Sequence, residues 1–83
     1  MYHCRILVTL RQSILDPQGK AVEHGAHSLG FDRVRNIRIG KLVELDVDVS
    51  GPAEAEMIVK DLSAKLLSNP VMEDFEVSVV KKV

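Results

Sequence analysis

Residues 34–49, which read VRNIRIGKLVELDVDV, decide the fold of this chain. Apolar and polar residues alternate through most of the stretch, as they do in a strand that buries one of its two faces. Leu42 is an apolar residue within the polar row. The apolar row occupies odd-numbered positions and consists of Ile37, Ile39, Val43, Leu45, Val47 and Val49.

Two arrangements of this stretch keep its faces separate. A two-residue turn at Gly40 and Lys41 would pair Ile37 with Glu44, which mixes apolar and charged residues. A hairpin with a three-residue loop over 40–42 avoids this mixing, and so does one long strand bent at Gly40. A continuous strand would measure about 50 Å, whereas a compact domain of this length has a radius of gyration of about 12 Å. Its exposed edge therefore favours a dimer that shares strands.

A strand and a helix are predicted before this stretch. Residues 2–10 alternate as a half-buried strand does, with Leu7 as an apolar exception on the outward face. Asp16, which is followed by proline, is a favourable helix start because its carboxylate accepts hydrogen bonds from the free amides of the first turn. We expect a helix over about 17–29, ended by Gly30 in a left-handed conformation.

A second helix and a final strand are predicted after the stretch. Gly51 and the following proline begin the helix, and Asn69 before another proline ends it. Residues 72–80 alternate again and predict the last strand. The inward stripe of the second helix is predicted to consist of Ala55, Ile58, Val59, Leu62 and Leu66.

The predicted order is strand, helix, long strand or hairpin, helix, strand. This order indicates one α+β domain over residues 1–83, with two helices on one face of an antiparallel sheet and a relation to the ferredoxin-like arrangement. A chain this short buries only about 60% of the surface that its unfolded form exposes. Its stability margin is therefore thin, and oligomerisation is one remedy.

The composition argues against several classes of partner. Eleven Lys and Arg against twelve Asp and Glu leave no strong field that would attract nucleic acid or an anionic membrane. Three aromatic residues, Tyr2, Phe31 and Phe75, offer few stacking platforms for single-stranded nucleic acid. The single cysteine, Cys4, favours a reducing cytoplasm, and the amino-terminal apolar run is too short for a signal peptide or a membrane span.

No set of residues assembles an active site. His24 and His27 share a helix side, but the other ligands of a metal site are missing, so a solvated face is the favoured interpretation. Cys4 lies on the inward face of the first strand and is interpreted as a small buried hydrophobe. Asp46 and Asp48 are interpreted as part of a solvated strand face. A free-standing enzyme is therefore not expected, and no catalytic or metal-binding residue is assigned.

Four ordered motifs give the chain a family resemblance. The resemblance runs from end to end of the chain, and four motifs in order make it more specific than any one of them alone. They resemble the PurS subunit family and are LDPQGKAV at 15–22, SLGF at 28–31, VRNIRIGK at 34–41 and LLSNPVMEDF at 66–75.

The resemblance implies a PurS-like fold and a non-catalytic role in purine biosynthesis. A PurS subunit is expected to bridge the synthetase subunit PurL and the glutaminase subunit PurQ of phosphoribosylformylglycinamidine synthase and to assist ammonia transfer between them. The resemblance also implies a homodimer or a higher homo-oligomer. The resemblance implies that the synthetase uses ATP and Mg, whereas this chain binds no cofactor of its own.

Six residues within these motifs are predicted to face a partner. They combine special backbone residues with exposed polar ones and are Asp16, Gln18, Lys20, Arg38, Gly40 and Lys41. Part of this pattern has a purely structural explanation, since Asp16 also serves as helix punctuation. An alternative function is a dimeric, ACT-like module that senses a small molecule, because its element order is similar. A nucleic-acid-binding α+β domain is a third interpretation, which the balanced charge disfavours.

Overall fold

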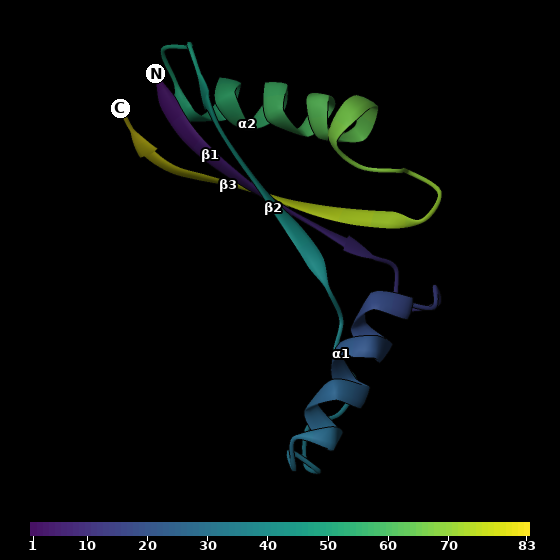
Figure 1. Ribbon diagram of the computed structural model, residues 1–83. Helices are drawn as coiled ribbons and strands as arrows, with labels where there is room; N and C mark the ends of the chain where they lie inside the picture. The colour runs from purple at the N-terminus through teal and green to yellow at the C-terminus, as the bar shows by residue number, and fades with distance from the viewer.

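The computed structural model describes all residues from 1 to 83 and contains a three-stranded antiparallel sheet, with one helix against it and one beyond its end (Figure 1). The predicted α+β class and element order are confirmed. Neither helix is long and apolar enough to cross a membrane. The elements in chain order are β1 (Tyr2–Leu10), α1 (Pro17–Ser28), β2 (Gly40–Val47), α2 (Pro52–Leu62), the π-helical turn η1 (Ser63–Leu67) and β3 (Glu73–Lys82).

The stretch 34–49 is a single extended segment and not a hairpin. Its strand β2 pairs only with β1, in a register that places Leu42 opposite Leu7 and Val43 opposite Ile6. Residues 34–39 lie outside the sheet and lead from α1 into β2 (Figure 1). The sheet order β2-β1-β3 makes β1 the central strand and leaves β2 at an edge. The stretch that could have formed one long strand is therefore an eight-residue edge strand with an extended leader.

Gly40 is required for a reason that differs from the expected bend. Gly30 is the glycine with a positive φ, at 94°, which confirms its predicted place after the end of α1. Gly40 has no positive φ. A Cβ atom at Gly40 would lie 2.8 Å from the carbonyl oxygen of Val8, so a side chain there would push β2 away from β1. The glycine permits close strand pairing.

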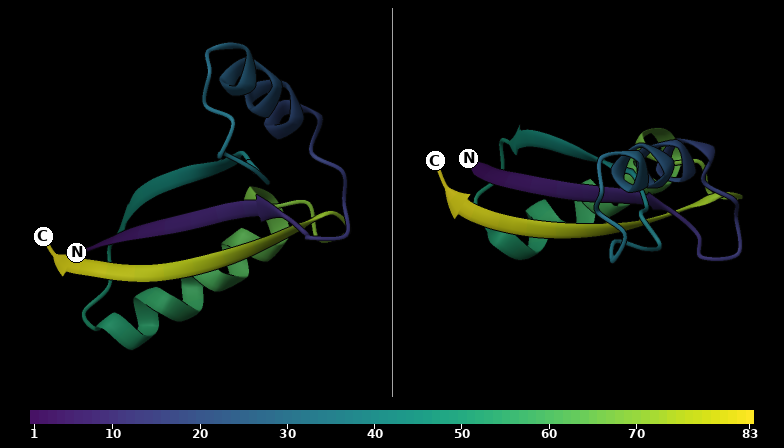
Figure 2. Two further views of the ribbon diagram at one scale, coloured as in Figure 1. Left: turned by 90° about the horizontal axis from the view of Figure 1, so that it is seen from below. Right: turned by 60° about the horizontal axis from the view of Figure 1, so that its bottom comes forward.

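The core lies between the sheet and α2. One face of β1 is almost completely buried, and α2 packs against β1 and β3 on this face (Figure 2). Alternation along β1 produces this face because every second side chain points to the same side. The buried apolar residues are Cys4, Ile6, Val8, Ala55 and Val59.

The inward stripe of α2 shifts by one residue at its end. Ala55 and Val59 are buried as predicted, but Ile58 is 42% exposed and Leu66 is 74% exposed. The π-helical turn η1 explains the exposure of Leu66. In this turn the N–H of Ser68 bonds the carbonyl of Ser63, five residues earlier. This wider turn places Leu67, rather than Leu66, against the core.

Helix α1 has a different position from the one expected. The prediction placed both helices on one sheet face, but only α2 packs against the sheet, and α1 lies beyond its end (Figures 1 and 2). We call residues 11–39 the arm. The arm makes the chain long and thin, with extents of 50 × 27 × 14 Å and a radius of gyration of 16.2 Å. The physical reason is that polar contacts, described next, hold α1 against its own return segment.

Candidate partner interface

Asp16 connects the two sides of the arm. Its side chain is 4% exposed, and one carboxylate oxygen accepts a hydrogen bond from the N–H of Gly19 at 2.9 Å, which caps α1. The other oxygen accepts a bond from the N–H of Ile39 at 2.7 Å, on the segment that leads into β2. These backbone donors, first that of Gly19 and then that of Ile39, lower the pKa of the Asp16 carboxyl.

Two further side chains fix the same junction. One guanidinium nitrogen of Arg38 donates to the carbonyls of Arg11 and Ile14, both at 2.9 Å, and so ties the return segment to the loop after β1. The carboxylate of Glu23 accepts a bond from the N–H of Ile37 at 3.2 Å, and this bond lowers the pKa of Glu23. The arm is therefore held to itself mainly by charged side chains that bond the backbone.

Gly19 allows α1 to approach the return segment closely. A Cβ atom at this position would overlap the carbonyl oxygen of Ile37. Gly25, in the same helix, has nothing within 4 Å of the equivalent position. Of these two helix glycines, Gly19 alone is required by packing.

The structure brings all six predicted interface residues to this junction, where they border two hollows that share Asp16. The first hollow, of about 240 Å³, lies where the arm meets the sheet and includes Gln18, Gly40 and Lys41. The second, of about 360 Å³, lies between α1 and the return segment and includes Lys20 and Arg38. Residues far apart in the sequence therefore form one continuous surface.

These six residues divide into two groups. Asp16, Arg38 and Gly40 have internal structural roles, as described above. Gln18, Lys20 and Lys41 are exposed, and their side chains make no hydrogen bond or ion pair within the chain. The second group is therefore free to contact another molecule.

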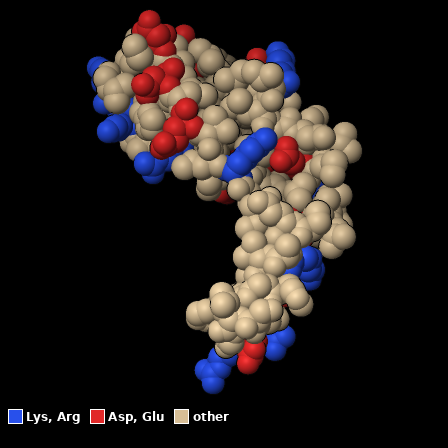
Figure 3. Space-filling model, in the orientation of Figure 1, with Lys and Arg blue, Asp and Glu red and all other residues tan.

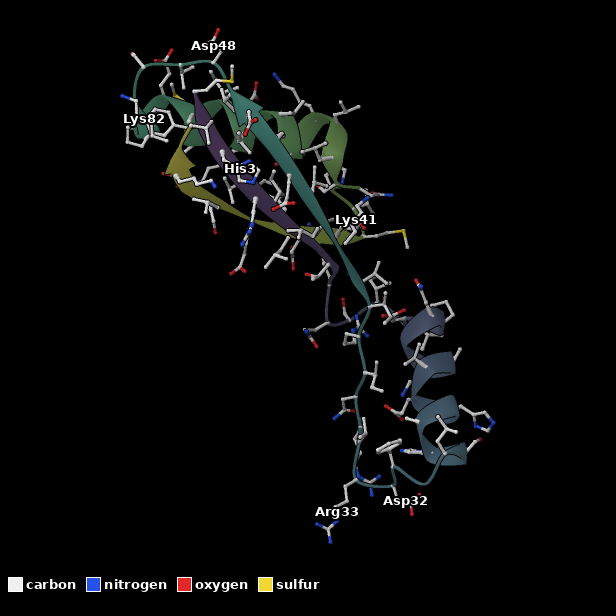
Figure 4. All side chains as sticks on the ribbon, turned by 60° about the vertical axis from the view of Figure 1, so that its left-hand side comes forward. His3, Asp32, Arg33, Lys41, Asp48 and Lys82 are labelled. Carbon is white, nitrogen blue, oxygen red and sulfur yellow. The ribbon has the colours of Figure 1, made fainter.

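The sheet face opposite α2 carries a row of paired charges. His3 Nδ1 lies 2.7 Å from a carboxylate oxygen of Asp46, and His3 Nε2 lies 3.4 Å from one of Glu44. Arg5 Nε bonds the same Glu44 oxygen at 2.8 Å. Figure 4 shows His3 on β1 in the upper part of the molecule, far from Asp32 and Arg33 at the tip of the arm. Leu7 pairs with a second apolar residue beside this row.

The residues that were considered as catalytic or metal-binding groups lie in environments that suit neither role. Cys4 is completely buried, and burial raises the pKa of its thiol. His27 Nε2 lies 2.7 Å from the carbonyl oxygen of Val34, and the backbone carbonyl of His24 accepts a bond from Ser28. No cluster of three or more His, Cys, Asp or Glu side chains could hold a metal ion. Asp46 and Asp48 are exposed, as predicted for a solvated strand face, and Asp46 also bonds His3.

Sequence reasoning missed the apolar surface of the arm. Leu15, Val22, Leu29 and Phe31 are between 45% and 78% exposed. Figure 3 shows that the visible face of the arm is mostly uncharged, with charged side chains gathered at its tip. These residues were visible in the sequence, within and beside the helix predicted over 17–29, but their exposure was not.

Comparisons with known proteins give one consistent result. The model of the PurS family, described as phosphoribosylformylglycinamidine (FGAM) synthase, matches residues 3–81. The PurS subunit of FGAM synthase from Bacillus subtilis is 41% identical over 83 residues, which cover 100% of this chain and 98% of that protein.

Two solved structures extend this result. Methanocaldococcus jannaschii PurS, described as a subunit of formylglycinamide ribonucleotide amidotransferase in purine biosynthesis, has a TM-score of 0.90 and 26% identity, with 100% of both chains covered. A chain of the PurLQS structure from Thermotoga maritima has a TM-score of 0.87 and 32% identity, and the similarity covers 95% of this chain and 96% of that one.

Proposed function

The chain belongs to the PurS family and is a subunit of FGAM synthase in purine biosynthesis, and we propose that it works as a strand-sharing homodimer that joins PurL to PurQ. The observation that carries this proposal is the shape of the single chain. It is a thin sheet with a long arm, and it buries only 8 of its 83 residues.

The exposed surface is too large for a compact monomer. A protein of 9.2 kDa is expected to expose about 4900 Å². This chain exposes 5970 Å², roughly 1000 Å² more. A stable interface buries about 800 Å² on each partner, so the excess is of the size that one partner would cover.

The edge of β2 is the place where a second copy would add. β2 pairs with β1 on one side only, and the extended leader 34–39 continues the edge beyond the sheet. The N–H groups of Arg35 and Arg38 donate to no acceptor in the chain. An open edge of this kind is a template for pairing with another strand.

The inner sheet face leaves room for the arm of a second copy. α2 packs against β1 and β3, so the inward side chains of β2, from Val43 to Val47, are only half-buried. Apolar side chains of α1 and its cap remain exposed, with Val22 45% and Leu29 78% exposed. In the proposed dimer, the arm of each copy lies over β2 of the other and restores two helices on one face.

The free polar residues of the junction supply the contact with PurL and PurQ. Gln18, Lys20 and Lys41 border open hollows and have no side-chain partner within the chain. Holding two subunits in register and excluding water is useful for ammonia transfer, because ammonia protonates or escapes in bulk water. In this proposal ATP and Mg are bound by PurL. The family match over residues 3–81 favours this role over an ACT-like sensor.

Light scattering after size-exclusion chromatography tests both the homodimer and its complex with PurL and PurQ. The chain alone is expected to be a dimer at micromolar concentration. Val22→Asp is expected to produce monomers because it places a charge on the arm surface that packs over β2 of the other copy in the proposed dimer. With matching PurL and PurQ, the wild-type chain is expected to produce one complex that contains all three subunits. A stable wild-type monomer, or an identical PurL–PurQ complex without the chain, would refute the proposal.

Charge reversal tests the heteromeric surface separately. Lys20→Glu with Lys41→Glu is expected to weaken complex formation while the dimer persists, since both side chains are exposed at the junction. Lys65→Glu is the matched control, because Lys65 is equally a surface lysine but lies on η1, where it pairs with Asp61. Equal complex formation by both variants would exclude the junction as the contact surface.

A further inference from the structure

We propose that His3 is a proton-controlled link between β1 and the edge strand β2. In its protonated form His3 binds two acidic side chains of β2, and in its neutral form it releases one of them. Within the sheet, β2 pairs with β1 alone. A link across this pair therefore controls how readily the edge strand opens.

The geometry suits a doubly protonated imidazole. The two ring nitrogens of His3 lie 2.7 Å from Asp46 and 3.4 Å from Glu44, two acidic residues on the same face of β2. A protonated imidazole donates through both nitrogens, whereas a neutral one has a single N–H. The shorter distance identifies Asp46 as the bond that survives in the neutral form, and Glu44 as the bond that is lost.

Several influences act on the charge of His3. Asp46 and Glu44 on β2 favour the protonated form, whereas desolvation disfavours it. The cations on this part of the sheet are Arg5 on β1, which pairs with Glu44, and Lys81, the β3 residue opposite His3. α2 lies on the other sheet face. The bonds to Asp46 and then to Glu44 dominate and raise the pKa of His3 above its ordinary value of 6.5.

The direction of the pH effect follows from this raised pKa. Since the pKa is higher in the folded chain, the link contributes its full stabilisation below pH 6.5 and loses it as the pH rises through the folded-state pKa. The edge strand is therefore held most firmly in weakly acidic solution. If the proposed dimer forms through the β2 edge, its association also weakens as the pH rises, a consequence that rests on the proposed function.

Hydrogen exchange of the whole chain tests the link directly. Protection factors, which correct for the intrinsic effect of pH, are compared between pH 5.5 and 8.5 for amides of β2 and β3. The ratio of β2 to β3 protection is expected to fall about two- to fivefold at the higher pH, the range that partly exposed ion pairs support. His3→Gln is expected to abolish this fall, whereas His24→Gln, a change on the arm, is expected to retain it.

NMR titration of the His3 ring gives an independent measurement. Its midpoint is expected above 6.5 in the wild-type chain and lower in Asp46→Asn, which removes one acidic partner. A midpoint at or below 6.5, or the same pH dependence of β2 protection in His3→Gln and wild type, would overturn the proposal. Both measurements use this chain without PurL or PurQ, so their failure is distinguishable from failure of the proposed assembly.

Discussion

The carboxylate of Asp16 lies 2.7 Å from the backbone nitrogen of Ile39, so the residue that caps α1 also holds the segment that enters β2. Both buried residues of the junction, Asp16 and Gly19, are polar or lack a side chain. The arm is therefore held by hydrogen bonds, and its apolar residues remain on the surface. This arrangement preserves the arm's direction while leaving its apolar surface for a partner.

Asp16→Asn is expected to loosen the arm without unfolding the sheet. The amide has one acceptor oxygen, so it cannot accept bonds from Gly19 and Ile39 in the manner of the carboxylate. Proteolysis within residues 11–39 should become faster, while amide protection in β1 and β3 stays close to that of the wild type. Equal proteolysis of variant and wild type would contradict the assigned role of Asp16.

Acid is expected to release the arm through the same carboxylates. The pKa values of Asp16 and Glu23 are lowered below their ordinary 3.8 and 4.5, so their contribution is present above those values and is lost as the pH falls through the folded-state pKa values. NMR should show that the amide shift of Ile39 titrates with a midpoint below 3.8. A midpoint at or above 3.8 would show that the carboxylate does not hold this amide.

Two glycines of α1 are expected to respond oppositely to alanine. Gly19→Ala places a Cβ atom against the carbonyl of Ile37 and should destabilise the chain by about 1–3 kcal/mol. Gly25→Ala meets no atom within 4 Å and should stabilise α1 by about 0.5–1 kcal/mol. Urea denaturation measures both. The same sign of change in both variants would contradict the close approach at Gly19.

The π-helical turn η1 is expected to determine which side chain contributes to the core. Val59 is completely buried, so Val59→Ala should cost about 2–3 kcal/mol. Leu66 is 74% exposed, and Leu66→Ala should change the free energy of unfolding by less than about 0.5 kcal/mol. Urea denaturation that shows similar losses for the two variants would mean that the stripe of α2 continues without the turn.

Local patterns predicted most of the elements. Alternation identified β1 with its exact bounds, and Asp16 with Gly30 marked the limits of α1 to within one residue. The pairing of Leu7 with Leu42, the two residues that broke the polar rows, shows that register information was present in both strands. Such patterns are readable because they depend on neighbours in sequence.

The missed features depend on contacts that sequence spacing does not encode. Period-two alternation extends back through 36–39, but that segment has no neighbouring strand within the chain, so the pattern alone could not show that it lies outside the sheet. The shift from Leu66 to Leu67 follows from a single wider turn. The position of α1 follows from bonds between residues more than 10 positions apart, such as Glu23 and Ile37.

The same limits apply to the candidate interface. The motifs identified six residues that the fold gathers at one junction. The capping role of Asp16 was predicted, but the motifs could not separate Arg38, whose side chain bonds the backbone of the chain, from the exposed Lys20. Gly19 lies within the first motif, but the motif could not show that this glycine approaches the backbone of Ile37.

The most direct test is the turnover of reconstituted FGAM synthase with and without this chain. PurL and PurQ are assayed with glutamine and, separately, with an ammonium salt as the nitrogen source. We expect omission of the chain to abolish most glutamine-dependent turnover while ammonium-dependent turnover by PurL persists, because joining and ammonia transfer are lost but PurL chemistry is not. Unchanged glutamine-dependent turnover without the chain would contradict the account.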